Sequence, residues 1–185
     1  MTEGPENSGL IDIRDAETGA RVLSFQGNDE DVTDVAFSPD GSKLATTAKD
    51  GTLAVWDPST GRLLSSRWPS GEAWGPSFSA DGSLVSAAWF DAGLVQVLDL
   101  STDRVVSTIR VDGPIDTALS PDGRHVAVAQ VWTNDEVGAV FDVNTGEESF
   151  ALAGPNGGGH PKWRGVSWSP DGRLIAGTSQ GTARV

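Results

Sequence analysis

The sequence Ser38-Pro39-Asp40-Gly41 returns three more times in the chain with small changes. Its copies are Ser79-Ala80-Asp81-Gly82, Ser120-Pro121-Asp122-Gly123 and Ser169-Pro170-Asp171-Gly172, and their first serines lie 41, 41 and 49 residues apart. Self-similarity at a period of about 40–45 residues is typical of chains built from stacked supersecondary units. The sequence therefore predicts a repeat protein.

Each copy has the residue preferences of a tight turn between two strands. Serine, proline, aspartate and glycine, in that order, suit a type I turn. A short apolar run such as residues 35–37 precedes each turn, and another such as residues 44–47 follows it. The pattern predicts one antiparallel hairpin in every repeat.

A second recurring sequence predicts a second hairpin in every repeat. Alternating runs end at four aspartates spaced 42, 42 and 43 residues apart, namely Asp15, Asp57, Asp99 and Asp142. A short polar turn and another strand-like run follow each of them. Each repeat therefore has four strands, and the lack of helical periodicity predicts an all-β protein with essentially no α-helix.

Four short strands per repeat, joined by turns rich in Asp and Gly, are typical of one blade of a β-propeller. The repeats resemble those of the WD-repeat propellers, in which the third strand tends to end in Trp-Asp and the first hairpin carries a similar turn. Trp-Asp is present at Trp56-Asp57, whereas Arg14, Leu98 and Phe141 take the tryptophan position in the other repeats. The resemblance covers nearly the whole chain.

The repeat spacing predicts one propeller domain, or a part of one, over residues 1–185. With strands a to d counted outward from the propeller axis, the chain opens with strands c and d, continues with three complete blades, and ends with strands a and b and the start of c. The corresponding ranges are 1–29, 30–71, 72–111, 112–155 and 160–185. Three arrangements stay open: a piece of a larger propeller, closure of one chain through its terminal strands, and two chains that complete a larger ring.

Composition narrows the class of protein. Hydrophobic residues make up 37% of the 185 residues and no cysteine is present, so a globular core is expected without disulfides or thiolate metal sites. No apolar run approaches the roughly 20 residues of a membrane helix, and residues 1–8 are acidic and polar, unlike a signal peptide. The formal charge of −13 disfavours binding to nucleic acid or anionic membranes. We therefore expect a cytoplasmic protein, and the predominance of arginine over lysine indicates a bacterial source.

The sequence offers few groups for catalysis. His125 and His160 lack the spacing of a catalytic triad or a zinc site, and the glycines at 157–159 lack the Lys-Ser/Thr of a phosphate loop. Most aspartates recur at turn positions, where they accept hydrogen bonds from backbone amides. The stretch 28–31 lacks the oxygen spacing of a calcium loop and is interpreted as solvated. No catalytic residue, cofactor or metal site is predicted.

The seven tryptophans are more informative. Trp56 and Trp168 fall at repeat positions of large apolar residues and are predicted to pack between blades. Five aromatic residues fall where strand a begins or strand b ends, which is one face of a propeller: Trp74, Trp89, Phe90, Trp132 and Trp163. Tryptophan is enriched at binding hot spots, so this set is predicted to bind a partner. The alternative is that these side chains only cover the tops of the blades.

By resemblance, the expected function is that of a non-catalytic scaffold or sensor module. Such a module presents a rigid face to a protein or peptide partner, here within a larger regulatory protein. The alternative is a propeller-type hydrolase or lyase with acidic residues at the channel mouth. An enzyme would place unique polar residues at the channel, whereas most acidic residues of this chain follow the repeat. A second copy of the chain is a further candidate partner.

Overall fold

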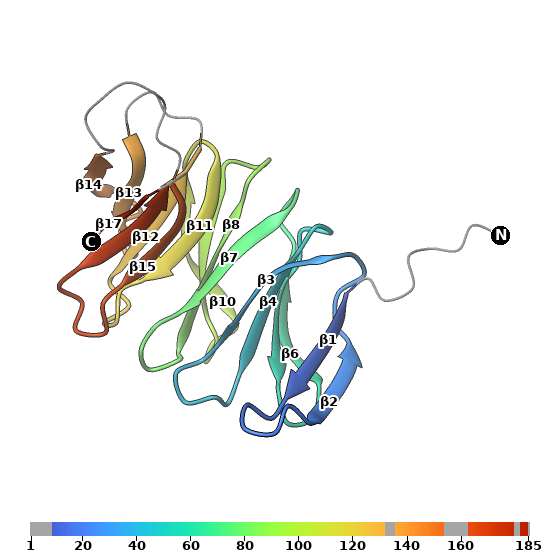
Figure 1. The fold of residues 1–185 in the computed structure, drawn as a ribbon. Helices are drawn as coiled ribbons and strands as arrows, with labels where there is room; N and C mark the ends of the chain where they lie inside the picture. The colour runs from blue at the N-terminus through green and yellow to red at the C-terminus, as the bar shows by residue number, and fades with distance from the viewer. Residues whose placement is uncertain (1–8, 132–135, 154–162, 180–181, 185) are drawn as a thin grey trace.

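The computed structural model describes residues 9–131, 136–153, 163–179 and 182–184, although the side chains of 136, 137, 153, 163, 179 and 182–184 are outside that description. Within these ranges the chain forms only strands and turns, which confirms the predicted all-β class. The strands form five antiparallel sheets that follow one another along the chain (Figure 1). No helix in these ranges is long and apolar enough to cross a membrane.

Each complete sheet is a four-stranded meander in which consecutive strands pair. The first sheet contains β1 (Leu10–Arg14) and β2 (Arg21–Gln26). The second contains β3 (Val32–Phe37), β4 (Leu44–Ala48), β5 (Leu53–Asp57) and β6 (Arg62–Arg67). The third contains β7 (Ala73–Phe78), β8 (Leu84–Trp89), β9 (Leu94–Asp99) and β10 (Arg104–Arg110). The fourth contains β11 (Pro114–Leu119), β12 (His125–Gln130), β13 (Glu136–Asp142) and β14 (Glu148–Ala153). The fifth contains β15 (Trp163–Trp168), β16 (Ile175–Ser179) and β17 (Thr182–Arg184).

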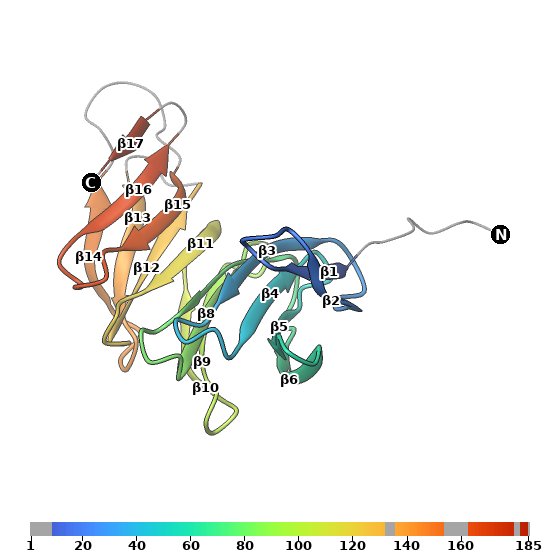
Figure 2. The same cartoon turned by 60° about the horizontal axis from the view of Figure 1, so that its bottom comes forward.

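The sheets stack in chain order, and from the second sheet on the first strand of each lies beside the first strand of the next. Strand β7 contacts both β3 and β11, and β11 contacts β15. The two-stranded sheet and the β15–β17 sheet lie at opposite ends of this stack (Figure 2). The terminal strands therefore do not pair with each other within the chain, and closure of one chain, which was open from the sequence, is not the arrangement seen.

The hydrophobic core consists of the contact layers between successive sheets. One buried layer joins Leu53 and Val55 to Val85 and Trp89 of the next sheet. Trp56 is 6% exposed and packs between the first two sheets, where its ring lies 5.3 Å from that of Phe25. The predicted packing role of Trp56 is confirmed. Each blade is stabilised mainly by its neighbours, because burial of apolar surface occurs between blades and not within one.

The recurring Ser-Pro-Asp-Gly turn has the same hydrogen bonds in each repeat. In the first copy, Ser38 Oγ donates to Asp40 Oδ1 at 2.6 Å and accepts from Lys43 N at 2.9 Å. Gly41 has a φ of 69°, in the left-handed region that only glycine adopts without strain. The hydrogen bond from Ser79, followed by those from Ser83, lowers the pKa of Asp81 to about 2. The turn role predicted for these aspartates is confirmed.

Candidate functional site

The connections after the second and fourth strands of the blades form one continuous edge. This loop rim comprises residues 27–31, 49–52, 68–72, 90–93 and 111–113. Backbone hydrogen bonds join its members: Lys49 N donates to Asp31 O at 3.0 Å, and Val111 N donates to Gly93 O at 3.0 Å. The rim is therefore a set of loops held to one another, not a set of independent connections.

Glycine permits the closest approach on this rim. A Cβ atom at Gly51 would lie 2.3 Å from Gly71 O, and Gly51 itself has a φ of 85°. Gly71 in turn lies against Asp91. A Cβ atom added to Gly71 would be only 2.8 Å from the Cβ atom of Asp91. Larger residues would push these loops apart, so glycine at Gly51 and Gly71 keeps the rim compact.

The structure places Trp89 in the core and not on the exposed rim. Its side chain is 0% exposed, and its Nε1–H donates to Gly51 O of the preceding blade at 2.7 Å. The Trp89 residue predicted for partner binding is therefore a packing residue in this structure. Its indole fits because Ala45 and Ala73 in the same layer are small.

The other predicted aromatic residues differ in their surroundings. Trp74 is half-buried on β7, and Phe90 is half-buried beside a recess of about 560 Å³. That recess is lined by Phe90, Asp91, Ala92, Gly93, Asp112 and Gly113. Trp132 lies outside the described residues, as do His160 and the glycines at 157–159. The backbone of Trp163 begins β15, but its side chain is not described.

The most exposed tryptophan of the rim was missed in the sequence. Trp68 follows β6 and is 68% exposed. It borders a cavity of about 420 Å³ that is lined by Gly27, Asn28, Asp29, Asp50, Thr52, Ala54, Trp56, Leu63, Ser66 and Trp68. The repeat could have indicated this exposure, because the polar residues Gln26 and Arg110 occupy the corresponding positions. Both are also exposed in the structure.

A hydrogen-bond relay connects this cavity to the core. Trp56 Nε1 donates to Thr46 Oγ1 at 2.9 Å, and Thr46 Oγ1 donates to Asn28 Oδ1 at 2.9 Å. Asn28 is 3% exposed, so its interpretation as part of a solvated loop was wrong. The relay ties the loop that leaves β2 to strands β4 and β5 of the next sheet.

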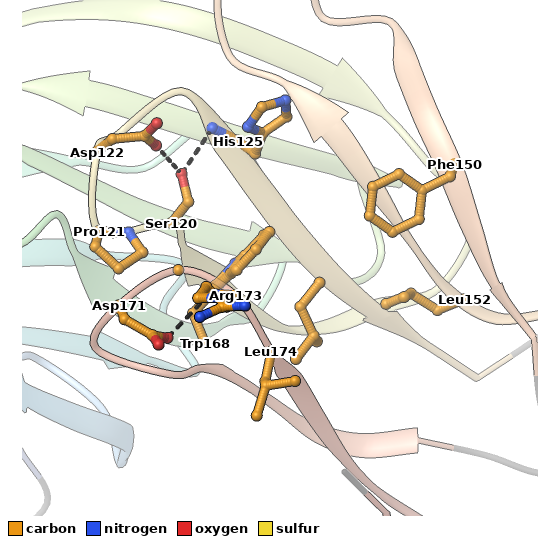
Figure 3. A pocket seen from close by; sticks show the side chains of 12 residues that line it. Ser120, Pro121, Asp122, His125, Phe150, Leu152, Trp168, Asp171, Arg173 and Leu174 are labelled. Carbon is orange, nitrogen blue, oxygen red and sulfur yellow. Dashed lines mark hydrogen bonds between the residues drawn. The ribbon is translucent and has the colours of Figure 1, made fainter.

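A groove of about 660 Å³ lies between the fourth and fifth sheets, beside the Ser-Pro-Asp-Gly turns of both (Figure 3). Phe150, Leu152, Trp168 and Leu174 border it, together with a Ser120–Asp122–His125 cluster. Ser120 Oγ donates to Asp122 Oδ1 at 2.7 Å and accepts from the backbone N of His125 at 2.9 Å. The imidazole ring of His125 forms neither of these two hydrogen bonds.

This cluster is the repeated turn and not a catalytic triad. The same two bonds occur at Ser38, Ser79 and Ser169, where the residue in the place of His125 is lysine or leucine. A nucleophile needs a base that accepts its proton, and here the Ser120 hydroxyl proton is directed to Asp122 as part of the turn. In the part of the chain that the structure describes, no three His, Cys, Asp or Glu residues are placed to hold a metal ion.

One carboxylate on the inner strands has an unusual environment. Asp116 of β11 accepts from Val166 N at 2.8 Å and from Thr117 N at 2.9 Å, and so joins the fourth sheet to the fifth. Burial, with a smaller contribution from Asp34, raises the pKa of Asp116 to about 6. Gly75 lies so close that a Cβ there would be 2.2 Å from Asp116 Oδ1. The carboxylate acts as an inter-blade hydrogen-bond acceptor.

Comparison with known proteins identifies the repeat. The family "WD domain, G-beta repeat" matches residues 19–57 and 156–185. WD repeat-containing protein SL1-17 of Schistosoma mansoni is 30% identical over 180 residues, which is 95% of this chain and 57% of that protein. Coronin-7 of Mus musculus is 32% identical over 93 residues, 49% of this chain and 10% of that protein. The target of rapamycin complex subunit LST8 of Saccharomyces cerevisiae is 41% identical over 56 residues, 30% of this chain and 18% of that protein.

The chain spans less than two thirds of the length of each of these relatives. The three relatives are eukaryotic, so they give no support to the predicted bacterial source. The family matches, the relatives and the four-stranded antiparallel sheets together support the resemblance to WD repeats, and the fold is all-β with sheets consistent with WD-repeat-like β-propeller blades.

Proposed function

We propose that this chain is a non-catalytic interaction module that presents its loop rim to a protein or peptide partner. The observation that carries the proposal is the contrast between the two edges of the blades. At the edge of the Ser-Pro-Asp-Gly turns, the polar groups bind one another within each turn. At the loop rim, Trp68 and Phe90 lie beside recesses with carboxylates at their borders.

Rigid backbone and accessible aromatic side chains are what a binding face needs. The rim loops are held to one another by backbone hydrogen bonds that extend the strand pairs of each blade, so ordering them costs little conformational entropy on binding. Trp68 presents a large side chain of the type that is enriched at hot spots. Trp74, Phe90, Trp132 and Trp163 complete the proposed binding set, and Trp89 supports the rim from the core.

The relatives favour the same class of function. LST8 of yeast is by name a subunit of the target of rapamycin complex, which is a role in an assembly and not an enzyme activity. A scaffold role within a larger regulatory protein follows for this chain by analogy. No observation in the described residues favours the hydrolase or lyase alternative, because the Ser120 cluster is accounted for by the repeated turn.

Two further features belong to this proposal. A cytoplasmic location is in keeping with an acidic chain that lacks cysteine. Association of two copies would cover apolar side chains exposed toward the N-terminal end of the stack, such as Phe37 of β3, which is 54% exposed. Exposed apolar faces of this kind favour association.

Affinity capture of partners from cells of the source organism tests the proposal. Phe90→Ser and Trp68→Ser change the rim, and Phe150→Ser is the matched control, because Phe150 is 49% exposed but lies in the groove between the last two sheets. We expect each rim variant to lower the captured amount of the same partner about tenfold or more, with no loss for the control. Capture that depends on Phe150 and not on the rim would contradict the proposal.

A further inference from the structure

The cavity beside Trp68 has the chemistry of a recognition site. The loop after β2 supplies Asn28 and Asp29, and the loop between β4 and β5 supplies Asp50 and Thr52. Trp56 and Ala54 form apolar lining, and Trp68 stands at the border. At about 420 Å³, the cavity falls within the size range of small-ligand sites.

Asn28 brings an unused hydrogen-bond donor to this cavity. Its Oδ1 accepts from Thr46 Oγ1, which fixes the orientation of the amide. Its Nδ2 is buried and has no acceptor among the described residues. A buried N–H group without an acceptor is unfavourable, so a carbonyl oxygen that reached it by displacing the side chains that cover it would gain a hydrogen bond.

The carboxylates of the cavity are not neutralised by the protein. The Asp50 carboxylate accepts hydrogen bonds from the backbone amides of Thr52 at 2.8 Å and Asp29 at 3.1 Å. Within the described ranges, no Lys or Arg nitrogen lies within ion-pair distance of Asp29 or Asp50. The neighbouring cations are engaged elsewhere: Lys49 pairs with Asp31 at 2.9 Å and Arg67 with Asp103 at 3.0 Å.

Trp68 adds a surface that favours a cation. Its side chain is 68% exposed at the border of the same cavity. The face of an indole ring attracts a guanidinium or ammonium group placed within about 6 Å, and a planar guanidinium can stack on it while donating to carboxylates. An anionic ligand would instead be repelled by Asp29, Asp50 and the net charge of −13.

We propose that this cavity binds an arginine side chain of a partner polypeptide, whose guanidinium stacks on Trp68 and pairs with Asp29 and Asp50, while a peptide carbonyl accepts from Asn28 Nδ2. The inference rests on the proposed function, because it names the partner chemistry of one part of the loop rim. Charge complementarity favours a cation as the ligand, because the cavity has two carboxylates without a cationic partner and an exposed indole ring.

Nuclear magnetic resonance titration of the full chain tests this assignment. The probe is the blocked peptide acetyl-Gly-Gly-Arg-Gly-Gly-amide, and its control carries citrulline, which has nearly the same shape without the charge. We expect saturable shifts of the Trp68 indole and Asn28 side-chain amide signals with a Kd of about 1 mM, and at least about fivefold weaker binding of the citrulline peptide. A lysine peptide should bind more weakly than the arginine peptide.

Variants locate the site. Trp68→Ser and Asp29→Asn change exposed side chains, so they should fold normally and weaken arginine binding about fivefold each. Asp112→Asn is the matched control, because that exposed carboxylate lines the other rim recess. Absence of saturable shifts at Trp68 up to about 10 mM probe, or equal binding of the citrulline peptide, would overturn the assignment.

The two proposals fail in different ways. If capture of a native partner depends on Phe90 while the arginine probe leaves Trp68 and Asn28 unaffected, the rim binds a partner but this cavity does not take an arginine. If the probe binds at Trp68 while the amount of captured partner is the same for every rim variant, the cavity binds arginine and the proposed function is wrong. Shifts confined to residues 90–93 would place the cation in the other recess and refute the cavity assignment.

Discussion

Substitution of Trp89 by phenylalanine should destabilise the protein strongly, although the sequence suggests a surface position. The indole is 0% exposed and its N–H donates to the carbonyl of Gly51 at 2.7 Å. Phenylalanine keeps the apolar ring but leaves this buried carbonyl without its donor, at a cost of about 1–3 kcal/mol. The smaller ring also leaves a cavity that adds about 1 kcal/mol. We expect a loss of about 2–4 kcal/mol in the free energy of unfolding.

Urea unfolding followed by far-ultraviolet circular dichroism measures this loss, with Trp68→Phe as the matched control. Trp68 is 68% exposed, so the same substitution there should change stability by less than about 0.5 kcal/mol. The midpoint of Trp89→Phe should fall while the slope of the transition stays constant. Equal midpoints for the two variants would refute the placement of Trp89 in the core.

Three further predictions concern the Thr46 hydrogen bonds, the buried Asp116 carboxylate and the exposed Phe37 side chain. Thr46→Val removes both bonds of the relay between Trp56 and Asn28, so it should cost about 2–4 kcal/mol in urea unfolding, and a cost under about 0.5 kcal/mol would refute the relay. Asp116 has a folded pKa of about 6 against an ordinary 3.8, so its contribution to stability is present below pH 4 and is lost as the pH rises to 6. The stability of Asp116→Asn relative to wild type should therefore rise by up to about 3 kcal/mol between pH 4 and 7, and a flat difference would contradict the burial of the charge. Phe37→Ser should lower the average mass in concentrated solution by light scattering if the exposed end face mediates association, whereas an unchanged mass would exclude that face.

The repeat made the fold predictable. A turn sequence that recurs at a fixed spacing specifies where strands begin and end, and its side-chain hydrogen bonds are local, as those of Ser38 and Asp40 show. Packing between blades was predictable for Trp56 because large apolar residues, Leu98 and Phe141, occupy its position in two other repeats. Local chemistry and repeat register therefore account for the all-β class and for part of the core.

The candidate site was less predictable because it depends on contacts between blades. Trp89 occupies the repeat position of Ala48 and Gln130, and the structure buries all three, but the residue types at this position differ too much for the sequence to indicate burial. Nothing local distinguishes an indole that enters the neighbouring blade from one that faces solvent. Asn28 was assigned to solvent because it begins an acidic stretch, but its partner Thr46 is 18 residues away on another sheet.

A binding footprint tests the central claim most directly. Hydrogen exchange of the chain, alone and in complex with its captured partner, reports which backbone amides the partner protects. The account predicts added protection at residues 27–31, 49–52, 68–72 and 90–93 of the loop rim, and none at the turns 38–43, 79–84 and 120–125. Protection confined to those turns, with the rim exchanging as in the free chain, would contradict the assignment of the rim as the interaction face.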